Sequence, residues 1–228
     1  MKNLCFATIV LLATTVLTGA QSTDSKSILR RGDALVAQEK YKLAIEEYSK
    51  VLTRDHDSFA RATYNIGVCY YELWQTDNAI EFYKRAVELK QGNYPKASYA
   101  LGVALEDQGK TAEARKAYEQ AVSASRGELA RATYRIGVLE AKAGEFEKAA
   151  ALFREAAARA GEHVPASHNN LGVMLARLGF LKEAEMQFVL ALKAADGRYD
   201  DAAYNLNLCH KEAQKAQNDL SKIILSLL

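Results

Sequence analysis

The side chains with the greatest chemical reactivity in this sequence are cysteines and histidines. Cys69 and Cys209 lie in the main part of the chain, and two cysteines outside a reducing compartment can form a disulfide. The histidines are His56, His163, His168 and His210. None of them shows metal-ligand spacing with acids or cysteines. Cys209 directly precedes His210, but neighbours on a helix point apart, so they do not make a nucleophile–base pair.

The sequence also lacks the other common signatures of catalysis. It has no glycine-rich phosphate loop, and no serine or cysteine nucleophile with a suitably spaced base. We therefore interpret the histidines as structural or solvated, and we predict a protein that is not an enzyme and needs no cofactor or metal. The 30 basic and 28 acidic residues nearly balance, so we expect no overall attraction to nucleic acid.

The first residues differ in composition from everything that follows. One lysine precedes an apolar stretch over Leu4–Leu17, and small residues follow at Thr18-Gly19-Ala20. This order is typical of a secretory signal peptide, which we assign to residues 1–20, with a short linker at 21–24. We therefore expect an exported bacterial protein, periplasmic or secreted, with no membrane span in its mature chain. An uncleaved membrane anchor is the alternative.

The elements that position the remaining side chains follow from an internal repeat of 35 residues. Glycine recurs at Gly32, Gly67, Gly102, Gly137 and Gly172. Alanine recurs at Ala44, Ala79, Ala114, Ala149 and Ala184. An aromatic residue recurs at Tyr48, Tyr83, Tyr118, Phe153 and Phe188. Such spacing predicts two amphipathic helices in each unit, with the glycine leaving room for a neighbouring helix to approach closely.

A turn should separate the two helices of each unit. Gly109, Gly144 and Gly179 share one position of the repeat, and glycine suits a helix end that needs a left-handed residue. Trp74 takes this position in the second unit. Its side chain either covers the end of its hairpin or is exposed as an anchor for a partner.

The pattern of these units resembles that of the tetratricopeptide repeat family. Its signature is present as Ile66-Gly67-Val68-Cys69-Tyr70, followed by Ala79, Tyr83 and Ala86. The unit here is 35 residues where the family's is usually 34. The usual tryptophan position holds Thr63, Ser98, Thr133 and His168. The resemblance implies an all-α fold, a right-handed α-solenoid of stacked helix-turn-helix units.

The repeat boundaries divide the mature chain into five units and a remainder. The units are 25–59, 60–94, 95–129, 130–164 and 165–199. We expect helix pairs near 25–38/41–54, 60–74/76–90, 95–108/111–124, 130–143/146–160 and 165–178/181–195. Residues 200–228 then form a sixth half-repeat and capping helix, which starts near Asp200 and runs to about Ser226. Its apolar end either caps repeat five or contacts a partner or a second copy.

The resemblance further implies that ligand contacts come from the first helix of each pair. One position of that helix holds Tyr64, Tyr99, Tyr134 and Tyr204, and together with a valine position it should form the floor of the groove. The same helices carry basic side chains at Arg61, Lys96, Arg131 and Arg135, and amide side chains at Asn65 and Asn170. Because these cations thin out after the fourth unit, we expect an acidic peptide segment bound nearer the first four repeats. The tyrosines alternatively serve as scaffold in the crease between helices, and the cations alternatively form a solvated face.

The stack also changes the interpretation of the cysteines. Cys69 and Cys209 lie four whole units apart, and packed helices are spaced by roughly 8–10 Å. We therefore expect two buried thiols that cannot form an intramolecular bridge. The function that we predict is an exported interaction scaffold that binds a protein or peptide partner in a concave groove. The alternative is a membrane-tethered or self-associating structural protein that uses its apolar C-terminal helix.

Overall fold

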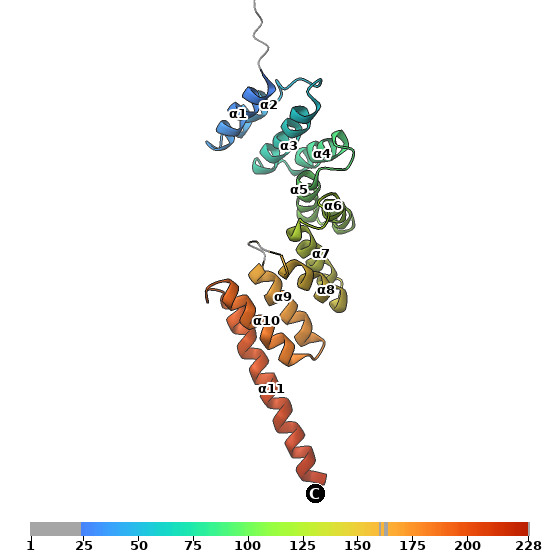
Figure 1. Ribbon diagram of the computed structural model, residues 1–228, viewed down its shortest axis with the longest axis vertical. Helices are drawn as coiled ribbons and strands as arrows, with labels where there is room; N and C mark the ends of the chain where they lie inside the picture. Colours follow the sequence, from blue (N-terminus) through green and yellow to red (C-terminus); the bar gives the residue numbers. More distant parts are fainter. Residues whose placement is uncertain (1–23, 160, 162–163, 228) are drawn as a thin grey trace, which may run out of the picture.

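The structure is a computed structural model that describes residues 24–159, 161 and 164–227, with side chains described up to residue 218. Over these ranges the chain forms eleven helices and no strand. They are α1 (Ser25–Val36), α2 (Tyr41–Tyr48), α3 (His56–Glu72), α4 (Thr76–Leu89), α5 (Pro95–Asp107), α6 (Thr111–Ala124), α7 (Ala130–Lys142), α8 (Phe146–Ala157), α9 (Val164–Arg177), α10 (Leu181–Ala194) and α11 (Asp200–Leu227). The first ten form five hairpins stacked along the long axis of the molecule (Figure 1). The predicted all-α solenoid is confirmed.

The five helix pairs lie where the repeat predicts them, apart from the boundary between the first two units. There α2 ends at Tyr48 rather than near residue 54, and α3 begins at His56 rather than near residue 60. The earlier start of α3 has a local cause, because the Asp55 side chain accepts a hydrogen bond from the Ser58 backbone N–H at 3.3 Å. A side chain that caps a free N–H in this way fixes the first residue of a helix.

The repeated glycine and the repeated aromatic residue pack directly against each other in every hairpin. A Cβ atom added to Gly102 would lie 2.5 Å from the ring of Tyr118, and the other four pairs show the same overlap. The ring of the second helix therefore lies on the backbone of the first. The neighbouring helix for which the glycine leaves room is therefore the second helix of the same hairpin, whose aromatic ring fills the space.

The turns inside the hairpins use one left-handed residue each, at the position where the repeat predicts it. Gly109, Gly144 and Gly179 have φ values of 72°, 84° and 87°. Trp74 holds the same position with φ of 59°, and its side chain is 92% exposed. The interpretation that Trp74 covers the end of its hairpin is therefore wrong, because the indole lies in solvent.

Replacing Trp74 with glycine is expected to stabilise the protein by about 1 kcal/mol, since a left-handed backbone is unfavourable for every residue with a Cβ atom. Urea denaturation followed by circular dichroism measures the change. Gln75→Gly is the matched control, because Gln75 has φ of −96° and gains nothing from glycine. Lower stability for Trp74→Gly than for the parent would contradict this account of the turn.

The two thiols are buried and unbonded, as the repeat predicts. Cys69 lies in α3 and Cys209 in α11, at opposite ends of the stack. Burial raises the pKa of the Cys69 thiol to about 11, and it also raises that of Cys209. Both side chains are therefore uncharged at neutral pH, and they pack as small apolar residues.

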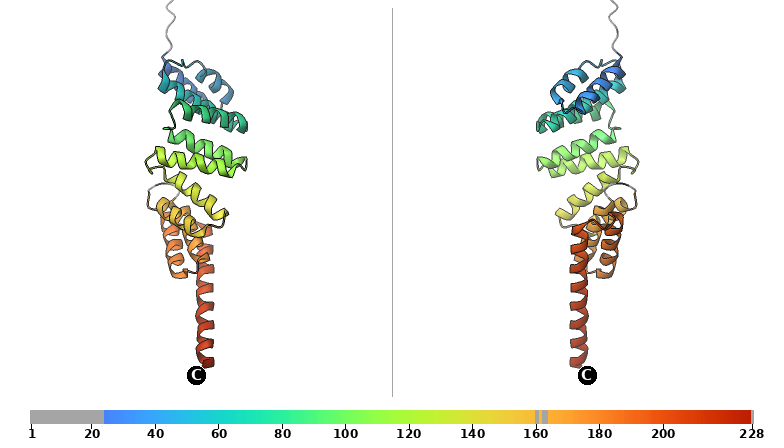
Figure 2. Two further views of the ribbon diagram at one scale, coloured as in Figure 1. Left: turned by 90° about the vertical axis from the view of Figure 1, so that its right-hand side faces the viewer. Right: turned by 90° about the vertical axis from the view of Figure 1, so that its left-hand side faces the viewer.

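The last helix divides into a supported half and a projecting half. Ala202 and Cys209 of α11 are buried, and Cys209 belongs to the apolar core formed by α8, α9 and α10. The remainder of α11 continues as one helix beyond the stack (Figure 2). The apolar side chains of residues 219–228, which the sequence assigns to a cap or a contact, lie outside the described side chains.

Candidate functional site

Pockets lie in the creases between successive first helices, on the surface that we call the first-helix face. The first pocket, of about 220 Å³, is lined by α3, α4, α5 and α7. The second, of about 420 Å³, lies between α7, α8 and α9, and the third, of about 310 Å³, lies between α9, α10 and α11. The positions that the repeat singles out therefore lie on a face that is hollowed at several points.

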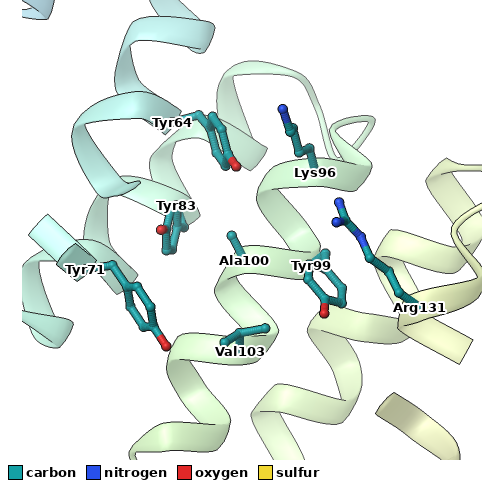
Figure 3. A pocket seen from close by; sticks show the side chains of 8 residues that line it. All are labelled: Tyr64, Tyr71, Tyr83, Lys96, Tyr99, Ala100, Val103 and Arg131. Atoms are coloured by element: carbon teal, nitrogen blue, oxygen red, sulfur yellow. The ribbon is translucent and has the colours of Figure 1, made fainter. Parts of the chain in front are cut away.

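The first pocket combines aromatic walls with two cations (Figure 3). Tyr64 and Tyr99 flank it, and Ala100 forms part of its floor. The ammonium of Lys96 lies 5.7 Å from the ring centre of Tyr64, and the guanidinium of Arg131 lies 4.5 Å from that of Tyr99. Each cation therefore stacks on the tyrosine of the preceding repeat, a favourable cation–π geometry that orients it over the pocket.

The tyrosines act both as scaffold and as pocket wall, so the two alternatives from the sequence are not exclusive. The ring centres of Tyr64 and Tyr83 lie 5.8 Å apart, those of Tyr99 and Tyr118 lie 5.7 Å apart, and Tyr134 makes the same contact with Phe153. Each tyrosine of the first helices is therefore half-buried against the second helix of its own hairpin. Tyr64 and Tyr99 also line the first pocket.

The fourth predicted tyrosine has a different environment. Tyr204 is 64% exposed, because α11 has no paired second helix on which its ring could pack. The hydroxyl of Tyr134 accepts a hydrogen bond from the Asn170 side chain at 3.2 Å, which joins α7 to α9. Tyr204 therefore lies on the same helix face as the other tyrosines without being part of a comparable wall.

Several of the predicted basic and amide side chains are already paired within the protein. Asp33 accepts hydrogen bonds from Arg61 at 2.7 Å and from Asn65 at 3.1 Å. Arg135 lies 3.7 Å from Glu106. Lys96 and Arg131, in contrast, make no ion pair among the described residues. The first pocket is therefore the place where the predicted cations remain available to an anion.

One position of the repeat determines how open each crease is. It holds Ala100 in α5, whose short side chain leaves space for the first pocket. In α7 the same position holds Arg135, which reaches across the next crease to Glu106 of α5. Glu106 also accepts from the Tyr118 hydroxyl at 2.9 Å, so the carboxylate links two hairpins. The sequence shows that Ala100 is small and Arg135 large at this position, but not which charge Arg135 meets.

Sequence analysis missed the basic residues of the second pocket. Lys142 and Arg177 both line it, and Arg177 stacks over the ring of Phe146 at 5.4 Å. Both are at one position of the repeat that is acidic in the preceding units, at Glu72 and Asp107. Arg177 therefore places a cation in the fifth repeat, where the positions of Arg131 and Arg135 hold Ala166 and Asn170.

The hydroxyls of Tyr64 and Tyr71 in the first pocket are uncharged over the physiological pH range. A hydrogen bond to Asp107, together with burial, raises the pKa of Tyr71 to about 12. Burial also raises the pKa of Tyr64. The positive charge of this pocket therefore comes from Lys96 and Arg131, with neutral hydroxyl groups beside them.

Two of the histidines, His168 and His210, form hydrogen bonds with other side chains of the stack. His168 shares a hydrogen bond with Gln187 at 2.8 Å, and His210 pairs with Glu185 at 2.9 Å. His56 is the first residue of α3, and His163 lies outside the described residues. Over the part of the chain that the structure describes, no group of three or more His, Cys, Asp or Glu side chains is placed to hold a metal ion.

Stacked hairpins whose first helices line a hollowed face define a helical-repeat solenoid, a class of proteins that bind along an extended surface. A family model described as "Tetratricopeptide repeat" matches residues 29–98, 99–164 and 134–200. Because these matches span most of the chain, it belongs to the tetratricopeptide repeat family. No curated protein matches the chain.

Solved structures of the same fold include MamA and YrrB. A crystal structure of MamA is 24% identical, covers 72% of this chain and 94% of its own, and superposes with a TM-score of 0.62. MamA from Desulfovibrio magneticus RS-1 is 19% identical, with 76% and 96% covered and a TM-score of 0.62. YrrB, described as a TPR protein with an unusual peptide-binding site, is 19% identical, with 81% and 92% covered and a TM-score of 0.62. These similarities establish the fold.

Proposed function

We propose that this protein is an exported scaffold that binds an acidic, extended peptide segment of a partner protein along its first-helix face. The family and the fold support protein–protein interaction in general. The peptide-binding site named for YrrB belongs to a protein of the same fold and favours the same mode here. Within the described residues, no helix is long and apolar enough to cross a membrane.

The first pocket is the observation that carries the proposal. Lys96 and Arg131 have no anionic partner among the described residues, although Arg61 and Arg135 on the same face do. A carboxylate that reaches this pocket can therefore pair with two cations without displacing an internal acid. The rings of Tyr64 and Tyr99 provide flat apolar surface for the stem of the same side chain. An aspartate or glutamate flanked by apolar residues matches these walls.

The spacing of the pockets further favours an extended segment. The first pocket ends at α7 and the second begins there, so both belong to one continuous row of helices. Arg177 supplies a cation without an ion pair among the described residues in the second pocket, whereas Lys142 beside it pairs with Glu106 at 3.3 Å. A peptide that crosses the creases meets an apolar wall and a cation twice, which increases both affinity and selectivity for acidic sequences.

Arg131→Glu is expected to weaken peptide binding at least tenfold, about 1.4 kcal/mol, because it reverses the charge that faces the bound carboxylate. Peptides selected from a random display library against the mature chain serve as probes, and fluorescence anisotropy measures their affinity. Arg154→Glu is the matched control, since Arg154 lies exposed on α8, away from the pockets. Selected peptides that bind both variants equally well would exclude the first pocket as the site.

The exported location rests on the sequence of residues 1–20, which lie outside the described residues. We propose that a signal peptidase removes this segment after Ala20, leaving Gln21 as the first residue of the mature chain. The intact mass of the protein recovered from a periplasmic or culture fraction tests this. A mass that includes residues 1–20 would instead support the anchored alternative.

A further inference from the structure

An apolar stripe lies on the outer face of α10, where the earlier hairpins are polar. Met186, Val189 and Leu190 follow one another at helical spacing and are exposed by 59%, 48% and 38%. Exposed apolar side chains that cluster in this way on a helix are typical of an interaction surface. We call these three residues the α10 stripe.

The other second helices provide an internal control for this stripe. At the same three positions stand Glu46, Ser49 and Lys50 at and just after the end of α2, Glu81, Lys84 and Arg85 in α4, Lys116, Glu119 and Gln120 in α6, and Ala151, Arg154 and Glu155 in α8. All but Gln120 are exposed, although a further hairpin follows each of these helices. The positions therefore face solvent throughout the stack, and the α10 stripe is not a surface left bare by the end of the repeats.

The projecting half of α11 begins where α10 begins, because the two helices run antiparallel. The thiol of Cys209 donates a hydrogen bond to the carbonyl of Leu181, the first residue of α10, at 3.2 Å. Residues 210–227 therefore extend past the end of the hairpin, over about 27 Å of helix. Figure 1 and Figure 2 show this part of α11 beyond the stack.

The apolar pattern of α11 continues from its supported half into its projecting half. Ala202, Leu206 and Cys209 pack on repeat five, at spacings of four and three. The sequence continues this alternation without interruption at Ala213, Ala216, Leu220, Ile223 and Leu227. A strict alternation of three and four keeps the apolar residues on one face that suits packing against another helix. The same helix face thus continues beyond the hairpin that covers its first part.

We propose that the protein forms a two-fold dimer in which the projecting half of α11 from each copy packs on the α10 stripe of the other. Both surfaces are apolar in sequence, and residues 213–227 span about 21 Å, which is long enough to cover the stripe on the 14-residue α10. One copy cannot bring its own two surfaces together, because α11 is a single helix that runs on past the first residue of α10 beyond Cys209. A reciprocal contact of this kind closes as a dimer.

This dimer is independent of peptide binding. The α10 stripe lies away from the first pocket, which α3, α4, α5 and α7 line. A dimer would carry two copies of the first-helix face and would therefore bind a partner with two acidic segments more tightly. Loss of dimerisation leaves the affinity for a single peptide unchanged, so failure of either proposal can be recognised separately.

Light scattering coupled to size-exclusion chromatography tests the dimer on the mature chain, at about 10 to 100 µM because assembly depends on concentration. We expect twice the monomer mass for the parent protein, and the monomer mass for the double variant Met186→Glu/Leu190→Glu. The chain that ends at Asn218 should also be monomeric. Ala151→Glu, at the position of Met186 but on α8, is the matched control and should remain a dimer.

A mixing experiment distinguishes the proposed exchange from pairing of α11 with itself. The double variant retains α11, and the chain that ends at Asn218 retains the α10 stripe. An equimolar mixture should therefore form a heterodimer with one of the two contacts, in which α11 of the double variant packs on the α10 stripe of the shortened chain. Circular dichroism confirms that both chains are folded. A monomeric parent protein, a dimeric Met186→Glu/Leu190→Glu variant, or a mixture that stays monomeric at the highest concentration would each overturn the proposal.

Discussion

Replacing Arg115 with methionine is expected to lower the free energy of unfolding by about 3 kcal/mol, because it leaves a buried carboxylate without its counter-charge. Glu140 of α7 is 2% exposed and forms an ion pair with Arg115 of α6. Removal of one partner from such a pair strands a charge that water cannot solvate. Urea denaturation of the parent and the variant, followed by circular dichroism, measures the difference.

The repeat itself supplies the control for this prediction. The position of Glu140 is occupied by Leu105 in the preceding unit and by Leu175 in the following one, and both leucines are buried. The double variant Arg115→Met/Glu140→Leu should therefore recover most of the stability, because it replaces the pair with the side chain that neighbouring hairpins use. If Arg115→Met alone is as stable as the parent, the carboxylate is not held by this pair.

Gly102→Ala is expected to lower the free energy of unfolding by about 3 kcal/mol through overpacking. The added methyl group would lie 2.5 Å from the ring of Tyr118, which is fully buried. The ring cannot easily move aside, because its hydroxyl donates to Glu106 at 2.9 Å. Alanine has a higher helix propensity than glycine by about 1 kcal/mol, so without the clash the substitution would be stabilising. Urea denaturation therefore distinguishes the two effects: a loss of stability indicates the clash, and a gain indicates helix propensity alone.

Two comparisons separate the clash from a general effect of replacing glycine. In a Tyr118→Leu background the additional cost of Gly102→Ala should fall, because the ring that meets the methyl group is gone. Gly109→Ala should cost about 1 kcal/mol, since its added Cβ meets no atom within 4 Å and the cost comes from its positive φ. Equal losses for Gly102→Ala in the parent and in the Tyr118→Leu background would refute the contact between the glycine and the ring.

The fold could be predicted from the sequence because its main contact recurs in every unit. A glycine and an aromatic residue at fixed spacing, as in Gly102 and Tyr118, describe a ring packed on a backbone, and five copies make the period unambiguous. The end of α2 was predicted less well. Asp55 caps α3 at His56, before the boundary that the repeat predicts, and this capping residue does not recur in the other units.

Four of the predicted residues line the first pocket, whereas the ion pairs on the same face were not predicted. The positions of Tyr64, Tyr99, Lys96 and Arg131 follow from the register of the first helices. Whether a cation on this face is available depends on acids from other hairpins, such as Glu106, which lies 29 positions before Arg135 in the chain. Such cross-repeat pairs have no periodic signature. The α10 stripe was missed for a similar reason, because an apolar residue in a helix resembles core until its face is known.

Site-specific photo-crosslinking tests the central proposal, a bound segment on the first-helix face, most directly. A benzophenone amino acid replaces Ala100, which lies in the first pocket beside Tyr99, or Lys116, which is exposed on α6 outside the first-helix pockets. The same partner should be captured in the cell from position 100 and not from 116, and Arg131→Glu should abolish the adduct. Capture from position 116 but not from 100 would contradict the account and place binding on the second helices.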